Sequence, residues 1–407
     1  MATVKVKFRT SRVPGKAGVI YYQLYHKQDC KQITTGFRIP RQCWDAERGE
    51  LIVLPEYEGL LRNYQRRIEY DISLLQRLIR EEDERKQDYL LSDIIALFRS
   101  SLAQTSVLAY TQEQIAVLRR NRQWGTARNY RRMLNSFSAF LQGNDIPFGL
   151  LDEELVLAYN DWLLDRKIVR NSISFYMRIL RSVYNKAVRQ HFAEQSFPFQ
   201  RVYTGIDRTC KRAVNENIIV SLQQLDLSFS ASLAFARDLF LFSYCTRGMA
   251  FVDVAYLRKE NVERGLISYI RHKTGQRLTI RMEPCIEEII ARYQDPSGKR
   301  PYLFPILTSE DPEKAYRQYL TALGYQNQKL KRISELLGKN LSMSSYTARH
   351  TWATAARNRN VPLSIISAGM GHSSEKTTQI YLDSLENSLI DRVNQRILER
   401  LNHGISI

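Results

Sequence analysis

A change of periodicity at about residue 57 restricts the fold of this chain more than any other feature. Before it, short stretches alternate apolar and polar residues or are rich in Val, Ile and Tyr, which is typical of β-strands. These stretches cover residues 4–8, 19–25 and 32–39. From 57 to 85 apolar residues recur at helical spacing instead. We therefore predict an antiparallel three-stranded sheet and one long helix, packed into an N-terminal module.

Helical spacing dominates the remainder of the chain. Helices are predicted near residues 107–121, 125–142, 152–166 and 171–190. The last part, from about residue 216, is also helical except for a strand-rich stretch near 265–282 with a turn at Thr274-Gly275. The predicted fold class is therefore multidomain and mainly α, with small β-sheets.

The charge balance favours a polyanionic partner. Lys and Arg outnumber Asp and Glu by 60 to 42, a net charge of +18, and nucleic acid is the simplest partner for such an excess. A basic protein without such a partner is the alternative that charge alone leaves open. Five cysteines without a C-x-x-C pair favour neither a zinc site nor a disulfide framework, and fit a reducing cytoplasm.

The sequence predicts neither secretion nor membrane insertion. Residues 1–5 lack the apolar core of a signal peptide, and no apolar run approaches the ~20 residues of a membrane span. We therefore expect a cytoplasmic, nucleoid-associated protein.

Arginines are concentrated on the helices predicted between 106 and 200, with tyrosines interleaved. A basic helical domain of this kind could grip a phosphate backbone. Solvated helix faces are the alternative for any one residue. The predicted DNA contacts are Arg119, Arg122, Arg128, Arg131, Arg132, Arg178 and Arg181.

Two motifs near the C-terminus suggest a chemistry. One contains Arg349-His350-Thr-Trp-Ala-Thr, and the other contains Gly-His372-Ser-Ser followed by Tyr381, nine residues after the histidine. Transesterification of a phosphodiester needs a nucleophilic oxygen, cations around the phosphate and a general acid. Arginine, lysine and histidine can supply the positive field without a metal or cofactor, so we predict neither.

These motifs, in this order and spacing, resemble those of the tyrosine recombinase (phage integrase) family. The resemblance implies that Tyr381 attacks the phosphate and holds a 3′-phosphotyrosyl link, while Arg349 clamps the phosphate and His372 bonds it. It gives His350 a supporting role. The alternatives are a half-buried helix tyrosine for Tyr381, and a capping or core histidine for His372.

The family's lysine stands on a hairpin ahead of the second arginine, where it acts as a general acid or minor-groove contact. Lys273, at the predicted turn, matches that position. Its neighbours Arg271, His272 and Arg277 are alternatives.

The first arginine of the family has no direct match. Aligning Asp253 with the family's glutamate places Ala250 at the arginine position, and Arg247 lies three residues earlier. If a helix begins at Arg247, positions 247 and 250 share a face, so we expect Arg247 to take the role. A surface arginine, with the first clamp missing, is the alternative. The Thr-Arg-Gly-Met stretch resembles integrases of Bacteroides-type mobile elements.

Tyr346 and Asp253 are two further positions at which the resemblance to the family bears on the chemistry. Tyr346 occupies the place where the family usually has histidine, so it can donate a hydrogen bond but carries no charge near neutral pH. Asp253 is expected to orient a cation, either Arg247 or a neighbouring histidine. A helix-surface carboxylate is the alternative for Asp253.

The resemblance also implies a domain plan and partners. It divides the chain into an arm-binding-like N-terminal domain (1–85), a helical core-binding, SAM-like domain (106–200) and a mixed α/β catalytic domain (216–407), joined by linkers at 86–105 and 201–215. The partners implied are double-stranded DNA with specific recombination sites, a homotetramer in the synapse and an accessory DNA-bending protein. The apolar residues at helical spacing after Tyr381 either close their own core or dock on an adjacent protomer.

We therefore expect a site-specific recombinase for integration and excision of a mobile element. A DNA invertase for phase variation would share its chemistry. A catalytically decayed DNA-binding protein is the alternative from another class, and a monomeric type IB topoisomerase is a third. Candidate contacts of the N-terminal sheet with a second DNA site are Lys5, Lys7, Arg9, Lys31 and Arg38. Solvated strand faces are the alternative for these residues.

Overall fold

The structure is a computed structural model of the 407-residue chain. It describes residues 2–13, 15–85, 88–207, 213–338, 341–372, 374, 375 and 378. The chain forms two compact units, Met1–Arg208 and Thr209–Ile407, each described by itself. Within the described residues no helix is both long and apolar enough to cross a membrane.

The N-terminal unit begins with the predicted three-stranded sheet. Strands β1 (Thr3–Arg9), β2 (Gly18–His26) and β3 (Asp29–Ile39) are antiparallel in the order β1-β2-β3. The register pairs Lys7 with Tyr21 and Tyr21 with Thr34, so the odd-numbered side chains of β1 and β2 share one face. A two-stranded ribbon, β4 (Trp44–Asp45) with β5 (Glu50–Leu51), follows.

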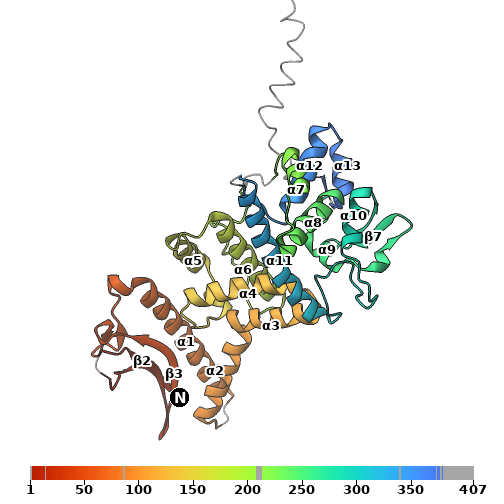
Figure 1. The fold of residues 1–407 in the computed structure, drawn as a ribbon. Helices are drawn as coiled ribbons and strands as arrows, with labels where there is room; N and C mark the ends of the chain where they lie inside the picture. Colours follow the sequence, from red (N-terminus) through yellow and green to blue (C-terminus); the bar gives the residue numbers. More distant parts are fainter. Residues whose placement is uncertain are drawn as a thin grey trace, which may run out of the picture. The chain divides into compact units, whose positions relative to one another are not determined.

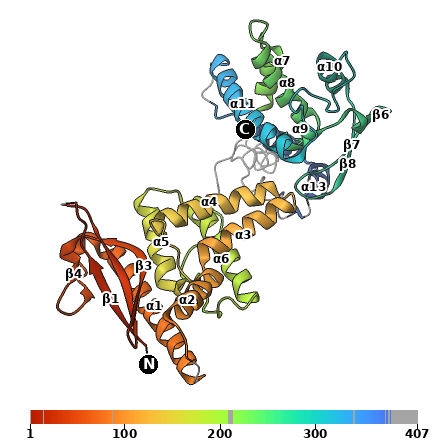
Figure 2. The ribbon, with the colours of Figure 1, turned by 90° about the horizontal axis from the view of Figure 1, so that it is seen from below.

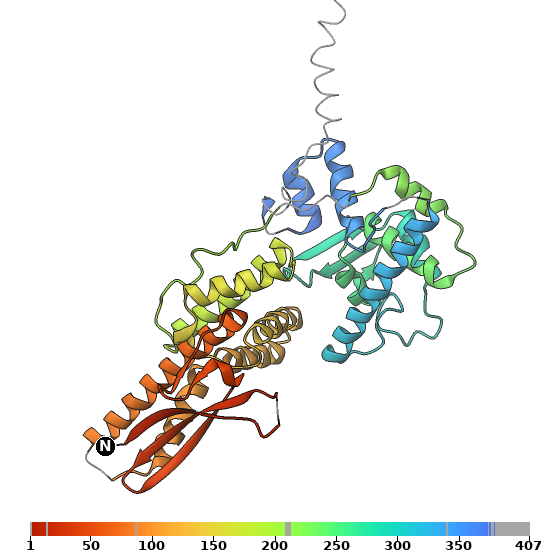
Figure 3. The same cartoon turned by 90° about the vertical axis from the view of Figure 1, so that its left-hand side faces the viewer.

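Two helices cover the other face of this sheet. They are α1 (Glu58–Glu84) and α2 (Leu91–Thr105), the second of which lies within the segment expected to be a linker. Tyr22, Leu24 and Ile33 pack with Leu75 of α1 and Phe98 of α2 in one apolar core. Figure 3 shows the orange helix α1 along one side of the red sheet. One face of the sheet is therefore occupied by the core, and the other is open.

A buried polar network ties α1 to its neighbours within this unit. Asp71 is only 3% exposed, and it accepts hydrogen bonds from the Tyr22 hydroxyl at 2.8 Å and the Arg67 Nε at 2.8 Å. Arg67 also donates to the carbonyl of Asp145, in the loop before η3 (Phe148–Leu150). Arg66 pairs with Asp152 at the start of the fifth helix. These contacts join the sheet module to the helices that follow.

Those helices are close to the predicted ones. They are α3 (Val107–Arg120), α4 (Trp124–Phe140), α5 (Glu153–Asp165) and α6 (Arg170–Arg189). Their apolar faces form one core that includes Phe137, Tyr159 and Tyr184. Figure 2 shows α3 and α4 side by side.

The C-terminal unit is mainly helical, with one small sheet at its edge (Figure 1). Its described helices are α7 (Glu216–Gln224), α8 (Ala231–Cys245), α9 (Phe251–Tyr256), α10 (Pro284–Arg292), α11 (Pro312–Leu336), α12 (Thr347–Asn358) and α13 (Leu363–Met370). Strands β7 (Leu266–Ile270) and β8 (Arg277–Arg281) form the predicted hairpin, and β6 (Val262–Glu263) adds a third strand. The apolar α8 is the central helix of the core, in contact with α7, α10, α11 and α12.

The mainly helical fold with small antiparallel sheets is thus confirmed.

Candidate active site

Arg349 is buried at the centre of a group of cations. It lies in the first turn of α12 with only 2% of its surface exposed. Its guanidinium donates to the carbonyl oxygens of Gly248 at 2.7 Å and Met370 at 2.6 Å, and to Nε2 of His372 at 3.0 Å. Its buried Nε–H has no partner within the described part of the chain. An arginine has five donors, of which three are engaged here and two are left, one of them the buried Nε–H.

The turn between α8 and α9 is pressed against Arg349. Gly248 has a left-handed backbone with φ of +71°, and a Cβ there would lie 2.7 Å from the Cα of Arg349. Only glycine fits this position without moving the helix or straining the backbone. The missing side chain lets the Gly248 carbonyl reach the guanidinium.

Arg247 lies in the same turn rather than on a helix. α9 begins at Phe251 with Ala250 as its N-cap. Arg247 and Ala250 therefore do not share a helix face, which corrects the expectation that a helix begins at Arg247. The cause is the left-handed turn, in which Arg247 itself has φ of +60°. Its Nη1 donates to the carbonyl of Thr279 on β8 at 3.4 Å. Its Cδ would lie 3.8 Å from a Cβ on Gly369, so the side chain reaches the C-terminal end of α13, just before His372.

The imidazole of His372 has a defined tautomer in this arrangement. Arginine has no acceptor, so Nε2 of His372 must accept the hydrogen bond from Arg349. Nδ1 then carries the proton and donates to the Thr378 hydroxyl at 2.8 Å. His372 is only 9% exposed and Thr378 is fully buried.

The β7–β8 turn brings further cations to the group. Arg271, only 6% exposed, donates from its guanidinium to the carbonyl of Gly371. Lys273 is exposed in the middle of this turn. The backbone N–H of His272 donates to the buried Asp253 carboxylate at 2.9 Å, and the His272 ring packs on Tyr256. The Asp253 carboxylate therefore holds the β7–β8 turn by accepting from a backbone N–H of the turn, rather than by pairing with a cationic side chain.

Burial and like charge together set the protonation of this group. Burial lowers the pKa of Arg349 to about 10, and the neighbouring Arg271 charge acts in the same direction. Burial lowers the pKa of His372 to about 4, with the positive charges of Arg349, Arg271 and Lys273 adding to the effect. Near neutral pH the imidazole is neutral and the guanidinium is charged. The group is thus positively charged and partly desolvated.

Tyr346 and His350 lie at the start of α12, one turn apart. Their rings meet edge to face with centroids 5.0 Å apart, and Tyr346 is 39% exposed. Tyr381 lies outside the described residues, as does the apolar pattern that follows it. The structure therefore brings together Arg349, His372, the Arg247 turn and the lysine turn, and it does not describe the nucleophile expected from the sequence.

Sequence reasoning missed three residues of this group. Arg271 was considered only as an alternative to Lys273, and neither Gly248 nor Thr378 was given a role in the site. The only local signal was their place beside motif residues. Within the described residues, no cluster of three or more His, Cys, Asp or Glu side chains is arranged to hold a metal ion.

Comparison with known proteins identifies the family. Residues 234–388 match the phage integrase family, and residues 106–202 match the phage integrase SAM-like domain. The chain belongs to the phage integrase family of tyrosine recombinases. Members of this family are DNA strand-transferring enzymes, so the chain is a recombinase.

Curated relatives agree with this assignment. The recombinase is 23% identical over 267 residues to tyrosine recombinase XerD of Pseudomonas aeruginosa, covering 63% of this chain and 85% of that protein. It is 24% identical over 277 residues to a tyrosine recombinase of Pseudothermotoga lettingae, covering 65% and 90%.

Solved structures share the fold. The Tn1549 transposon integrase in complex with a circular intermediate DNA has a TM-score of 0.52 at 15% identity, over 68% of this chain and 95% of that one. A lambda integrase dimer bound to a COC′ core site has a TM-score of 0.50 at 12% identity, with the same coverage.

The arginines predicted to contact DNA lie in the SAM-like domain of the recombinase. Arg128 and Arg132 lie on the side of α4 opposite its buried residues, and Arg131 is half-buried beside them. Arg119 and Arg122 are exposed at the end of α3, and Arg178 and Arg181 are half-buried on α6. Within the described residues none of the seven forms an ion pair with a carboxylate. Their charge is available to an external anion.

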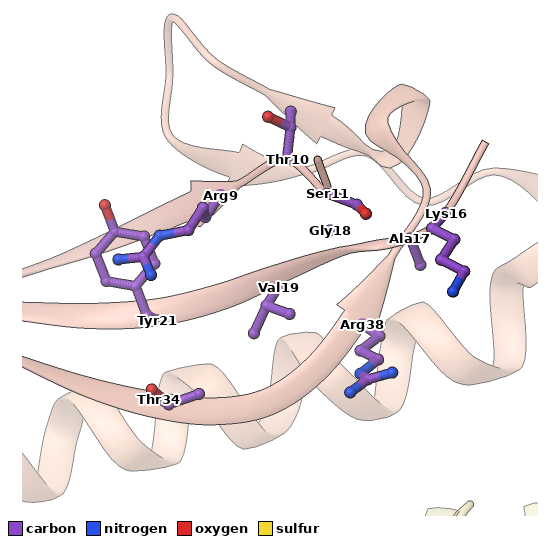
Figure 4. Close-up of a pocket in the computed structure, with 10 residues that line it drawn as sticks. All are labelled: Arg9, Thr10, Ser11, Lys16, Ala17, Gly18, Val19, Tyr21, Thr34 and Arg38. Carbon is purple, nitrogen blue, oxygen red and sulfur yellow. The ribbon is translucent and has the colours of Figure 1, made fainter. Parts of the chain in front are cut away.

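The open face of the N-terminal sheet is a second basic surface. Lys5, Lys7 and Arg9 of β1 lie on it, whereas Lys31 pairs with Leu24 and points to the opposite face. Arg9, Lys16 and Arg38 border a hollow of about 400 Å³, which no carboxylate lines. Figure 4 shows these side chains around the hollow, with Arg9 beside Tyr21.

Proposed function

We propose that this recombinase cleaves and rejoins duplex DNA at specific sites through a 3′-phosphotyrosine linkage to Tyr381, in the integration and excision of a mobile element. One observation supports this most directly. Arg349 keeps a buried, unpartnered donor beside a neutral His372 and two further cations, Arg271 and Lys273. Such a group costs free energy unless an anion occupies it.

The phosphate roles follow from the donors. Arg349 clamps the non-bridging oxygens, since a guanidinium matches phosphate geometry and its charge is strong where water is excluded. Arg247 provides the first clamp from its turn, in place of the arginine absent at Ala250. Once Arg349 turns to the phosphate, His372 can donate to it only with a proton on Nε2, which protonation or tautomer exchange supplies, and Tyr346 offers a hydroxyl donor. His350 supports α12.

Lys273 is the general acid. As the oxygen of Tyr381 bonds to phosphorus, the bond from phosphorus to the 5′-oxygen breaks, and the leaving oxygen takes a proton from the lysine. Because Lys273 is exposed in the turn, its side chain is accessible to bound DNA. Asp253 keeps the turn in place through the His272 backbone.

A nicked half-site oligonucleotide tests the function. The full-length recombinase is expected to form a covalent adduct, separable on a denaturing gel, that is absent in Tyr381→Phe. Tyr325→Phe, at an exposed tyrosine of α11, is the matched control and should retain the adduct. Specific binding without any adduct would overturn the proposal in favour of a decayed DNA-binding protein. Relaxation of supercoiled plasmid lacking a site would indicate a topoisomerase.

The other basic surfaces fit the same function. The SAM-like domain (106–200) and the catalytic domain (216–407), joined by the 201–215 linker, grip a half-site, with the arginines of α3, α4 and α6 on the backbone. The N-terminal module (1–85), followed by the 86–105 segment, binds a second site through the open face of its sheet. Sheet strands fit the major groove. We further propose that four subunits form the synapse, that an accessory protein bends the DNA, and that the recombinase is located at the nucleoid. The mobile element is proposed to be of the Bacteroides type.

Removal of residues 1–85 tests the second site. We expect the shortened recombinase to cleave half-sites as before but to lose integration of a full element. Because Arg67 and Asp71 stabilise the following helices, a chain with Lys5, Lys7 and Arg9 changed to Ser is the better variant. Unchanged integration by that variant would contradict a DNA-binding role for the sheet.

A further inference from the structure

Arg271 reaches from the lysine turn to the loop that carries His372. Its Nη1 donates to the carbonyl of Gly371, the residue before His372. Its Cδ would lie only 3.3 Å from a Cβ on Gly371. The two residues are 100 positions apart in the sequence, so this contact exists only in the folded unit.

Both ends of this contact are fixed by the backbone. The N–H of Arg271 bonds to the carbonyl of Gln276, and its carbonyl accepts from Gly275, which closes the turn around Lys273. Gly371 ends α13 with φ of +65°, and the N–H of His372 bonds back to Ser367. A Cβ on Gly371 would lie 2.8 Å from Leu278 of β8, so the loop and hairpin are in close contact. Arg271 is the polar link between these two rigid ends.

The cost of this arrangement argues for a role. A second buried guanidinium beside Arg349 loses hydration and repels its neighbour. An apolar side chain could fill the same space more cheaply. Its described polar contact holds a carbonyl of the site rather than a carboxylate. The charge is therefore used to hold the site together.

We infer that Arg271 is a positioning residue, whose guanidinium bridges the Lys273 turn and the His372 loop so that both act on the same phosphate. The inference rests on the proposed function. It separates Arg271 from the clamp assigned to Arg247, which approaches from the turn between α8 and α9. Without this bridge, the loop that carries His372 loses its contact with the hairpin, and the position and surroundings of the His372 imidazole change.

Nitrogen NMR of the full-length, histidine-labelled recombinase without DNA tests the bridge apart from the reaction. Among the described residues, the charged or polar groups that face His372 include Arg349 of α12, Arg271 and Lys273 of the hairpin turn, and the Thr378 hydroxyl. In the wild type we expect a neutral Nδ1–H tautomer with a pKa near 4. In Arg271→Met the pKa should rise and the tautomers should mix, because one cation and the loop contact are lost. His372→Gln assigns the signal.

Cleavage completes the test. Arg271→Met should slow adduct formation by roughly 100-fold, as expected for misplaced groups, with half-site affinity little changed. Arg271→Lys keeps the charge and one donor, so it should fold, keep the pKa of His372 depressed and restore part of the rate. Arg277→Met, at an exposed position of the same hairpin, is the matched control and should change neither readout.

Two results would overturn the bridge. If Arg271→Met loses cleavage with the His372 signal unchanged, Arg271 acts on the phosphate itself. If neither cleavage nor the signal changes, it has no role. Should Arg271→Met fail to fold, Arg271→Lys decides, since full activity with a normal histidine pKa would contradict the bridge. A wild type that forms no adduct refutes the proposed function instead, and leaves the NMR result standing.

Discussion

The open face of the N-terminal sheet and the cation group of the C-terminal unit use the same residue types in opposite ways. Lys5, Lys7 and Arg38 are exposed, whereas Arg349 and Arg271 are almost fully buried. Exposed cations cost little, and they bind DNA by releasing counterions. Buried cations have already lost their water, so they act strongly on charge that develops in a transition state. In the proposed function, burial rather than charge therefore separates the cations that give affinity from those that act in catalysis.

The largest effect should come from the buried side. Arg349→Ala removes the central guanidinium, so adduct formation should fall by at least ~10²–10³-fold, the range for lost transition-state donors. Half-site binding, measured by gel shift, should change by less than about tenfold. If cleavage persists while binding is lost, the assignment of buried cations to catalysis is wrong.

Packing should matter next. Gly248→Ala forces a Cβ to 2.7 Å from Arg349 and strains a left-handed turn, so thermal unfolding should show a loss of more than about 2 kcal/mol. Gly265→Ala is the matched control, with φ of +73° but open space around it, and should lose only about 1–2 kcal/mol. Equal losses in the two variants would mean that close approach to Arg349 costs nothing.

The neutral histidine gives a pH dependence. The pKa of His372 is lowered by burial from 6.5 to about 4, so the unfolded chain takes up the proton first as pH falls. Its contribution to stability is whole above pH 6.5, and is lost between about pH 6.5 and 4. Denaturant unfolding of His372→Gln should show an acid-side decline smaller by on the order of 1–3 kcal/mol. If the free energy of unfolding of the wild type and of His372→Gln fell equally with decreasing pH, burial would not be lowering the pKa of His372.

The smallest effect should come from the exposed side. Arg38→Ala should weaken binding to the second site a few-fold, and reduce the slope of log affinity against log salt by about 0.9. Arg62→Ala, an exposed arginine of α1 already paired with Glu58, is the control and should leave the slope unchanged. If the two variants had equal slopes, the hollow lined by Arg38 would not be part of the DNA-binding surface.

Local pattern was sufficient for the secondary structure and for the two motifs. The strand alternation of β1 and the helical spacing of α3 to α6 report on neighbours a few residues apart, so the elements were predictable within a few residues. The motif residues Arg349 and His372 were also found, and they meet as expected. The turn at Arg247 was not predictable, because a helix and a left-handed turn both tolerate Thr-Arg-Gly.

The sequence by itself determined the family, the order of the elements and the residue types available for phosphate chemistry. Only the tertiary structure decided that Arg271 is buried against Gly371, that Gly248 gives its carbonyl to Arg349, and that Lys31 points away from the other cations of the sheet. The physical reason is range. Periodicity encodes contacts within one helix turn or one strand pair, whereas burial and close backbone approach depend on segments a hundred residues apart packing together.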